Sequence, residues 1–377
     1  MRIIRGATRR VYISIIKPIL FTRHPDDVHT GLIQLGKCVQ KLPVVFHLPR
    51  LWSYQSPKLT QRVFGLDIRN PVGLSAGFDK DIELAPLMSS VGFGFMTGGS
   101  ITAKECAGNP KPWFHRLPHS RALVVHAGLP NKGVKAVTNR IAHYPERLFR
   151  DMPLAVSVAK TNTIQSATDN EAIIDYCESL QVLNSHHVGQ WYEINISCPN
   201  TYGGEPFTTP ARLRKLLDAI DALNIDRPVV IKMPIDKSWK EFRSLLEVIV
   251  SHKVDGVAIG NLSHSRQEVD ARDGLTQAVK GNISGLPTRR LSTDLIRHTY
   301  AAYGNRLIII GIGGIFSAAD AYEKIRAGAS LVALVTGMIF EGPQLIGEIN
   351  AGLEKYLRQD GFSSISDAVG VDVQKSV

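Results

Sequence analysis

The segment NISCPNT, residues 195–201, brings together groups that could do chemistry. It places the thiol of Cys198 between the carboxamides of Asn195 and Asn200. It also follows a mostly apolar stretch, 191–194, so the thiol stands where a strand is expected to end. A thiolate can remove a carbon-bound proton, and the two amides offer donors and acceptors to a planar imide or a carboxylate. A lone cysteine is more often a small buried hydrophobe, but the flanking amides favour a substrate pocket.

The length and composition of the chain limit the fold classes that could contain this pocket. A chain of 377 residues, 44% hydrophobic and 21% charged, suffices for one barrel of ~250 residues with an appendage, or for two smaller domains. The cysteines are far apart and form no C-x-x-C pair or Cys/His cluster at metal-ligand spacing; they are Cys38, Cys106, Cys177 and Cys198. We therefore expect no disulfide framework, no metal site and a reducing compartment.

The N-terminus is both basic and apolar. Before Asp26 the basic side chains are Arg2, Arg5, Arg9, Arg10, Lys17 and Arg23, and no acidic one accompanies them. Aliphatic residues separate these bases, so we expect a helix that lies on an anionic membrane surface. A basic tail that is merely solvated is the alternative. Nucleic acid is not expected as a partner, because the bases alternate with aliphatic side chains rather than with stacking aromatics.

The same segment is a poor candidate for a membrane span. Lys17-Pro18 interrupts the apolar run well short of the ~20 residues that a spanning helix needs. No small-residue cleavage site follows, which argues against a secretory signal. A second helix is expected to begin near Pro25 and to run toward Val39. We assign residues 1–45 to a membrane-facing helical extension and residues 46–377 to the main domain.

From residue 70 onward, short apolar strands alternate with connections long enough for helices. The eight expected strands are 72–76, 94–97, 154–158, 192–196, 229–233, 256–259, 307–312 and 331–335, and the expected helices include 210–223, 240–252, 292–303 and 318–327. Several strands lack polar alternation, as is typical of strands buried on both faces. The pattern predicts an α/β fold, a closed (β/α)8 TIM barrel; a doubly wound open sheet is the alternative.

Polar residues and glycines follow most of these strands. The carboxyl ends of all strands meet at one face of a parallel barrel, so these residues are expected to lie together. The residues expected at this face are Ala76, Gly77, Lys80, Ser100, Asn195, Cys198, Asn200, Lys232, Gly260, Asn261, Gly313, Gly314, Val335, Thr336 and Gly337. Backbone N–H groups in the loops after the last two strands would bind a phosphate, which predicts a phosphorylated cofactor across the mouth of the barrel.

Two lysines favour a flavin as that cofactor. Lys80 and Lys232 are both expected to project toward the mouth, and a positive charge near the N1 edge of a flavin stabilises its reduced anion. A nicotinamide enzyme would instead show a G-x-G-x-x-G turn that opens a βαβ unit, and the sequence has none in that context.

Longer motifs carry a resemblance to a known family. They are NPVGLSAGFDK (70–80), GFGF (92–95), GNPKP (108–112), SGLP (284–287), IGIGG (310–314) leading to EKIRAGAS (323–330), FEGP (340–343) and DGF (360–362). Over about residues 12–370 the chain resembles the dihydroorotate dehydrogenases, most of all the membrane-associated, quinone-using class 2 enzymes. That resemblance implies a peripheral membrane protein, at the cytoplasmic face of a bacterial inner membrane or, alternatively, at the mitochondrial inner membrane.

The resemblance also implies an FMN-dependent barrel that oxidises dihydroorotate to orotate in pyrimidine biosynthesis, with a quinone as electron acceptor. A base takes the C5 proton of the ring while hydride passes from C6 to flavin N5. By position, Cys198 corresponds to the base, and the substrate-binding positions are Lys80, Asn195, Asn200 and Asn261. The flavin-contacting positions are Ala76, Gly77, Lys80, Ser100, Ser157, Lys232, Gly260, Ser284, Gly285, Gly313, Gly314, Val335 and Thr336.

The chain departs from the family pattern at several site positions. Cys198 stands where class 2 enzymes usually have serine, Val125 and Ser157 stand where the family has asparagine, and Leu262 stands where a polar group is usual. One alternative is therefore a related flavin oxidoreductase that acts on another dihydropyrimidine or a cyclic ene. Another is a membrane-associated flavin-binding protein without catalysis. We expect the positively charged mouth to lower the pKa of Cys198 from its ordinary value of ~8.5.

Overall fold

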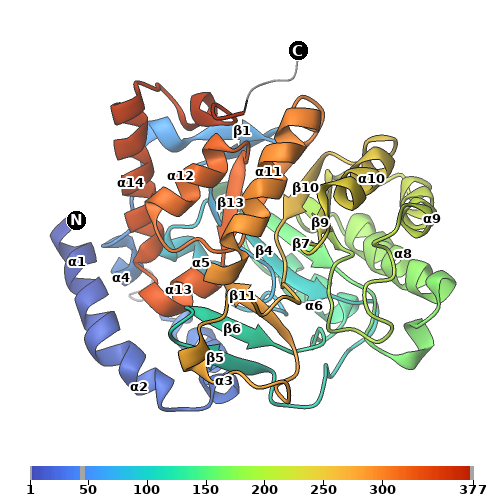
Figure 1. Ribbon diagram of the computed structural model, residues 1–377, viewed down its shortest axis with the longest axis horizontal. Helices are drawn as coiled ribbons and strands as arrows, with labels where there is room; N and C mark the ends of the chain where they lie inside the picture. Colours follow the sequence, from blue (N-terminus) through green and yellow to red (C-terminus); the bar gives the residue numbers. More distant parts are fainter. Residues whose placement is uncertain (1, 43–46, 374–377) are drawn as a thin grey trace.

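Eight parallel strands close into a barrel at the centre of the molecule (Figure 1). The computed structural model describes residues 2–42 and 47–373. In their order around the barrel, the strands are β3 (Val72–Leu74), β4 (Phe95–Ile101), β7 (Leu154–Val158), β8 (Trp191–Asn195), β9 (Val229–Met233), β10 (Gly256–Ile259), β12 (Ile308–Ile312) and β13 (Leu331–Leu334). Val332 on β13 lies opposite Val72 on β3, and this pairing closes the sheet. The predicted TIM barrel is confirmed, and the open-sheet alternative is wrong.

Large side chains fill the interior of the barrel. The ring centroids of Phe95 and Trp191 lie 5.7 Å apart, and both residues are fully buried. A short hairpin, β1 (Gln61–Val63) and β2 (Leu66–Ile68), covers this interior cluster through Phe64, whose ring lies 5.6 Å from Trp191. A Cβ on Gly73 would lie 2.2 Å from the ring of Phe95, so only glycine fits beside it. The barrel is therefore a packed core whose one open face is free to hold the site.

Helices surround the strands and bury a second, larger apolar layer. They are α5 (Ala85–Val91), α6 (Val134–Ala142), α7 (Glu146–Asp151), α8 (Asp169–Ser185), α9 (Pro210–Asp221), α10 (Trp239–Val250), α11 (Arg289–Tyr303), α12 (Ala318–Arg326), α13 (Thr336–Glu341) and α14 (Leu345–Asp360). The four helices expected from the sequence are α9, α10, α11 and α12, with ends that differ by up to three residues. Ser238 and Glu241 form a capping box that fixes the start of α10.

A second sheet of three antiparallel strands lies beside the barrel (Figure 1). Its strands are β5 (Phe114–Leu117), β6 (Ala122–Val125) and β11 (Asn282–Gly285), in the order β11, β6, β5. This sheet was not predicted from the sequence. Its strands have four residues each, and β11 is more than 150 positions from β6 in the chain, so no local pattern announces the pairing.

The N-terminal segment forms one helical rod along the barrel, visible in blue in Figure 1. It consists of α1 (Arg2–Val11), a π-helical stretch (Tyr12–Ile16) and α2 (Lys17–Phe21). The rod continues through Pro18, because the wider π turn before it accommodates a residue that lacks an N–H donor. The predicted helices are therefore confirmed, and the backbone helix does not end at Lys17-Pro18. None of the helices in the described residues has the length and apolarity to cross a membrane.

Polar contacts hold the rod against the barrel. Glu341 accepts hydrogen bonds from Arg9 at 2.7 Å and from Arg121 at 2.5 Å, and its side chain is only 8% exposed. The hydroxyl of Tyr12 donates to the carbonyl of Ile339 at 2.7 Å. After the rod, α3 (Pro25–Val39) packs near β5, and α4 (His47–Arg50) follows. The predicted boundary between residues 45 and 46 falls at residues 43–46, outside the described residues.

Candidate functional site

A cavity of about 230 Å³ opens at the carboxyl ends of the barrel strands. Strand-end residues form its inner part, the antiparallel sheet forms one wall, and α3 lines its outer part. A second cavity of about 100 Å³ adjoins it between the ends of β10, β12 and β13. The two share seven lining residues, namely Ala76, Lys232, Asn261, Leu262, Ser284, Val335 and Thr336. Because they share these walls, the two cavities lie side by side at the mouth of the barrel.

The structure brings together nearly all of the predicted site residues. Lining one or both cavities are Ala76, Gly77, Lys80, Ser100, Asn195, Cys198, Asn200, Lys232, Gly260, Asn261, Ser284, Gly285, Gly313, Gly314, Val335 and Thr336. Ser157 is the exception. It is fully buried, and its hydroxyl lies 2.8 Å from the hydroxyl of Ser100, so it supports Ser100 from behind and is not part of the cavity lining.

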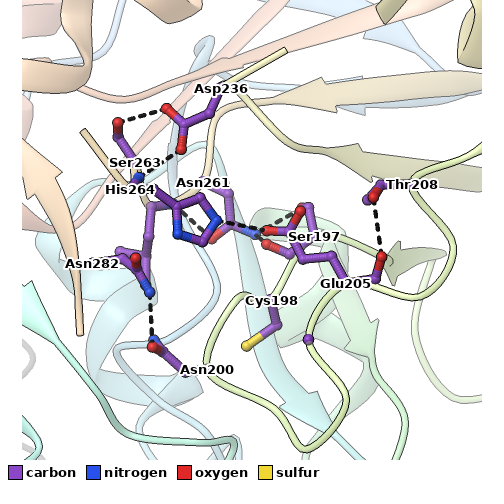
Figure 2. A network of polar contacts seen from close by, with 12 residues as sticks. Ser197, Cys198, Asn200, Glu205, Thr208, Asp236, Asn261, Ser263, His264 and Asn282 are labelled. Carbon is purple, nitrogen blue, oxygen red and sulfur yellow. Dashed lines mark hydrogen bonds and ion pairs between the residues drawn. The ribbon is translucent and has the colours of Figure 1, made fainter. Parts of the chain in front are cut away.

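Asn195 and Asn261, at the inner end of the cavity, belong to one hydrogen-bonded network, of which Figure 2 shows the contacts between Asn261 and Ser197. Asn195 donates to the hydroxyl of Ser100 at 2.9 Å. The amide nitrogen of Asn261 donates to the carbonyl of Ser197 at 2.7 Å and to Asn195 Oδ1 at 3.3 Å. The hydroxyl of Ser197 in turn donates to the carbonyl of Lys232 at 2.9 Å. These bonds tie the ends of four strands together, so the amides are preorganised before any ligand arrives.

The loop that carries Cys198 is fastened on several sides. Lys160, which is 2% exposed, donates to the carbonyl of Tyr202 at 2.6 Å. On another side of the loop, Glu205 faces His264 at 3.8 Å (Figure 2). The sequence analysis did not single out Lys160. Its only local signal was a basic residue two positions after the expected strand 154–158, which is common on protein surfaces.

Burial raises the pKa of Cys198 to about 11. The removal of the thiolate from water outweighs the opposing influence of the Asn200 backbone N–H group and of two cations, Lys232 and Lys160. The expectation of a lowered pKa is therefore wrong. The basic side chains that favoured it are present, but the cavity that holds them also excludes the water that would solvate a free thiolate.

Two lysines approach the cavity from opposite sides. Lys232 is 4% exposed, and the nearest carboxylate oxygen, from Glu193, lies 3.6 Å from its Nζ. Lys80 lies 5.4 Å from the ring centroid of Phe114 and 3.4 Å from the Nε2 of His29. Burial lowers the pKa of Lys80 to about 8, and burial followed by the nearby Lys80 charge lowers the pKa of His29 to about 3. His29 is therefore neutral at pH 7, whereas Lys80 remains mostly protonated.

The second cavity suits a phosphate group. Gly313 and Gly314 have φ values of +100° and +67°, in the region that favours glycine. A Cβ on Gly313 would lie 2.6 Å from the hydroxyl of Thr288, so the backbone approaches its neighbours too closely for a side chain. Lys232 is the one charged residue in the lining described by the structure, which contains no carboxylate. Backbone amides together with one cation are the donor set that a phosphorylated cofactor needs.

The outer part of the first cavity is mostly apolar, although Arg116 and His29 also line it. Val28 and Leu32 of α3 line it together with Leu123 and Ile339. The carboxylate of Asp26, at the start of the helix, accepts hydrogen bonds from the backbone N–H groups of residues 113 and 114 at 2.9 and 3.0 Å. This contact fixes α3 against β5. An elongated apolar molecule could therefore reach the inner cavity from this side.

The chain is similar to known proteins over most of its length. A family model described as "Dihydroorotate dehydrogenase" matches residues 58–357. A protein of Anaeromyxobacter dehalogenans named dihydroorotate dehydrogenase (quinone) is 37% identical, with 95% of this chain and 96% of that protein covered. One from Cyanothece sp. with the same name is 32% identical, with 94% and 98% covered. The crystal structure of DHODH from Eimeria tenella in complex with ferulenol matches with a TM-score of 0.80 and 28% identity, covering 92% of this chain and 95% of that one.

Proposed function

Since the chain belongs to the dihydroorotate dehydrogenase family, we propose that it oxidises dihydroorotate to orotate in the adjoining cavities and passes the electrons to a quinone. The family is flavin-dependent, and we propose FMN as the flavin. One observation carries the proposal: the cavity lined by the Cys198 thiol and the site amides directly adjoins the glycine-lined cavity that suits a phosphate. A flavin bound there supplies a two-electron acceptor for the ring and a donor for the quinone.

The residues of the chain then take distinct roles. Asn195, Asn200 and Asn261 hold the polar edges of the ring with their amides. Lys80 neutralises the carboxylate of the substrate. Cys198 removes the carbon-bound proton, and its raised pKa makes the thiolate a strong base once formed.

The cofactor end relies on charge and backbone. Lys232 would place a buried positive charge beside a bound flavin and stabilise the negative charge that develops when the flavin is reduced. The loops at Gly313 and Gly314 receive the phosphate. Ser100 orients Asn195 through their hydrogen bond, with Ser157 as its buried support.

The apolar outer part is the proposed route for the quinone. Exposed aliphatic residues continue from it onto the N-terminal helices, where Ile3 is 87%, Ile19 59% and Leu35 56% exposed. Together with the basic side chains of the rod, this surface favours peripheral association with an anionic membrane. A membrane that holds quinone, such as a bacterial inner membrane at its cytoplasmic face or a mitochondrial inner membrane, is the proposed location.

A second candidate substrate is a less polar ring, such as another dihydropyrimidine or a cyclic ene. The observation that favours it is the side chains of Val125 and Leu262, which line the cavity and add apolar surface to it.

The test is anaerobic flavin bleaching. The purified protein is checked for bound yellow flavin and then mixed with dihydroorotate or with dihydrouracil. For cyclic enes the reaction is run in reverse: the bound flavin is first reduced, and its reoxidation by a cyclic enone is followed. Rapid bleaching by dihydroorotate and reoxidation by a long-chain quinone are expected. Bleaching by another ring, with dihydroorotate inert, would select the second candidate. A protein that binds flavin and reacts with none of them would be the non-catalytic alternative.

A further inference from the structure

Asn282, a residue that the sequence analysis did not single out, lies beside the reaction cavity. It is the first residue of β11 and pairs directly with Val125 on β6. Directly paired residues of antiparallel strands point to the same face of the sheet, and Val125 lines the cavity. Ser284, two positions along β11, also lines the cavity, and residues two apart on a strand share a face. Asn282 therefore projects toward the cavity side of the sheet.

Its side chain contacts one of the proposed substrate-binding amides. The Nδ2 of Asn282 donates to Asn200 Oδ1 at 2.9 Å (Figure 2). Asn200 donates from its own Nδ2 to the carbonyl of Val125, also at 2.9 Å. Asn200 is only 8% exposed, so few water molecules can replace these partners. Two neighbouring strands of the antiparallel sheet thus hold both ends of one carboxamide.

The chemistry of these partners determines which way the Asn200 amide faces. A backbone carbonyl can only accept, so the NH2 group of Asn200 must face Val125. Asn200 Oδ1 must then face Asn282, which presents its own NH2 group. Without a donor at position 282, the oxygen of Asn200 loses its partner, and the carbonyl of Val125 alone holds the carboxamide. The ring in the cavity would then meet an amide that is held at one end only.

We propose that Asn282 is a positioning residue that fixes the orientation of the Asn200 carboxamide and thereby determines how tightly a polar ring binds. The inference rests on the proposed function, because it takes dihydroorotate and orotate as the molecules that Asn200 contacts. In this wall of the cavity, Val125 contributes only its backbone carbonyl as a polar group, and Asn282 on β11 contributes the polar side chain.

Two variants test this role. Asn282→Asp keeps the shape of the side chain and, when ionised, has no donor; Asn282→Leu removes all polarity. For both we expect the Kd of orotate and the KM of dihydroorotate to rise on the order of tenfold, as for one lost hydrogen bond. The KM of the quinone and the bound flavin should not change. Asn139→Asp and Asn139→Leu, on the exposed face of α6, make the same chemical changes away from the cavity and should have no effect.

Two further measurements separate positioning from a general structural effect. The Asn282→Asp variant should recover orotate affinity relative to wild type as the pH is lowered from 7 to 4, because a carboxyl with an ordinary pKa of ~3.9 then becomes substantially protonated and again donates to Asn200 Oδ1. In an Asn200→Ala background, Asn282→Asp should add no further loss, since its effect passes through Asn200.

The outcomes distinguish this inference from the proposed function. A wild type that dihydroorotate does not bleach and orotate does not bind would overturn the proposed function. A wild type that dihydroorotate bleaches, with unchanged Kd and KM in both Asn282 variants, would overturn only the role of Asn282. Equal losses for orotate, quinone and flavin would also overturn it, because they would indicate damage to the fold. If Asn282→Leu does not fold, the pH recovery of Asn282→Asp decides alone.

Discussion

The inner and outer halves of the cavity are built on different physical principles. In the inner half, Asn195, Asn200 and Ser197 are each less than a tenth exposed, and hydrogen bonds hold their side chains. In the outer half, Val28 and Leu32 of α3 offer apolar surface without directional contacts. A polar ring that misses one bond in the inner half leaves a buried group unpaired, whereas an apolar chain in the outer half loses affinity only in proportion to area. The inner half therefore discriminates between polar rings, whereas the outer half tolerates apolar chains that differ in shape.

The most severe test of the inner half removes its base. Replacing Cys198 with alanine should slow flavin reduction by dihydroorotate ~10²-fold or more, because a positioned general base is lost, while flavin stays bound. Stopped-flow anaerobic bleaching measures this rate. Cys198→Ser should keep part of the activity, with a pH optimum moved upward. Unchanged kinetics in Cys198→Ala would remove the thiol from the mechanism.

The raised pKa of Cys198 predicts a steep pH dependence. Below about 11 only a small fraction of the thiol is ionised, and that fraction grows with pH. At saturating dihydroorotate, the rate of flavin reduction should therefore rise about tenfold per pH unit between roughly pH 7 and 9. A rate that is flat over this interval would show that ionisation of the thiol does not control the step.

Lys80 should impose an opposite trend on binding. Its pKa is lowered to about 8, so the free enzyme loses this positive charge as the pH rises through that value. The KM of dihydroorotate should then increase above pH 8, by up to about tenfold per pH unit. Arginine remains protonated throughout, so Lys80→Arg should flatten the rise even if it weakens binding overall. A KM that does not vary from pH 7 to 9.5 in wild type would contradict the assignment.

A charge in the outer half should affect only the quinone. Leu32 is 41% exposed and lines the cavity, so Leu32→Glu can fold and places a carboxylate in the apolar route. We expect the KM of a long-chain quinone to rise on the order of tenfold, with bleaching by dihydroorotate unchanged. Ile174→Glu is the control, because Ile174 is 64% exposed on α8 and lines neither cavity. Equal effects of the two variants would remove the outer half from quinone binding.

The smallest effect is expected where the two halves meet. Val125 lines the cavity, and Val125→Asn adds an amide to its wall. If dihydroorotate is the substrate, its affinity should stay the same or tighten by up to ~10-fold, the value of a hydrogen bond of about 1.4 kcal/mol. Titration of wild type and variant with orotate measures the change. A clear loss of orotate affinity would favour a less polar native ring.

Local patterns were sufficient for the barrel and for most of the site. The eight apolar runs became the eight strands, because strands buried on both faces need no polar alternation and are recognisable without their partners. Once the strands are placed, barrel geometry gathers their carboxyl ends. Residues as distant as Lys80, Cys198 and Thr336 could therefore be assigned to one mouth.

Other features depend on partners that no local pattern contains. The antiparallel sheet joins β6 to β11 across more than 150 residues, and only that pairing brings Asn282 beside Asn200. The position of Ser157 also depends on packing. Its strand was predicted, but the sequence does not show that the side chain lies behind Ser100. The path of the helix through Pro18 required a π turn that residue preferences do not announce.

The sequence by itself determined which reactive groups exist and the strand ends from which they project: a thiol between two amides, two lysines and the glycines of the last two loops. Only the tertiary structure decided how those groups behave. The basic residues suggested a lowered pKa for Cys198, yet burial raises it to about 11. The reason is physical. Charge is a property of residue types and can be counted along a chain, whereas desolvation and hydrogen-bond direction arise from the folded surroundings of each atom.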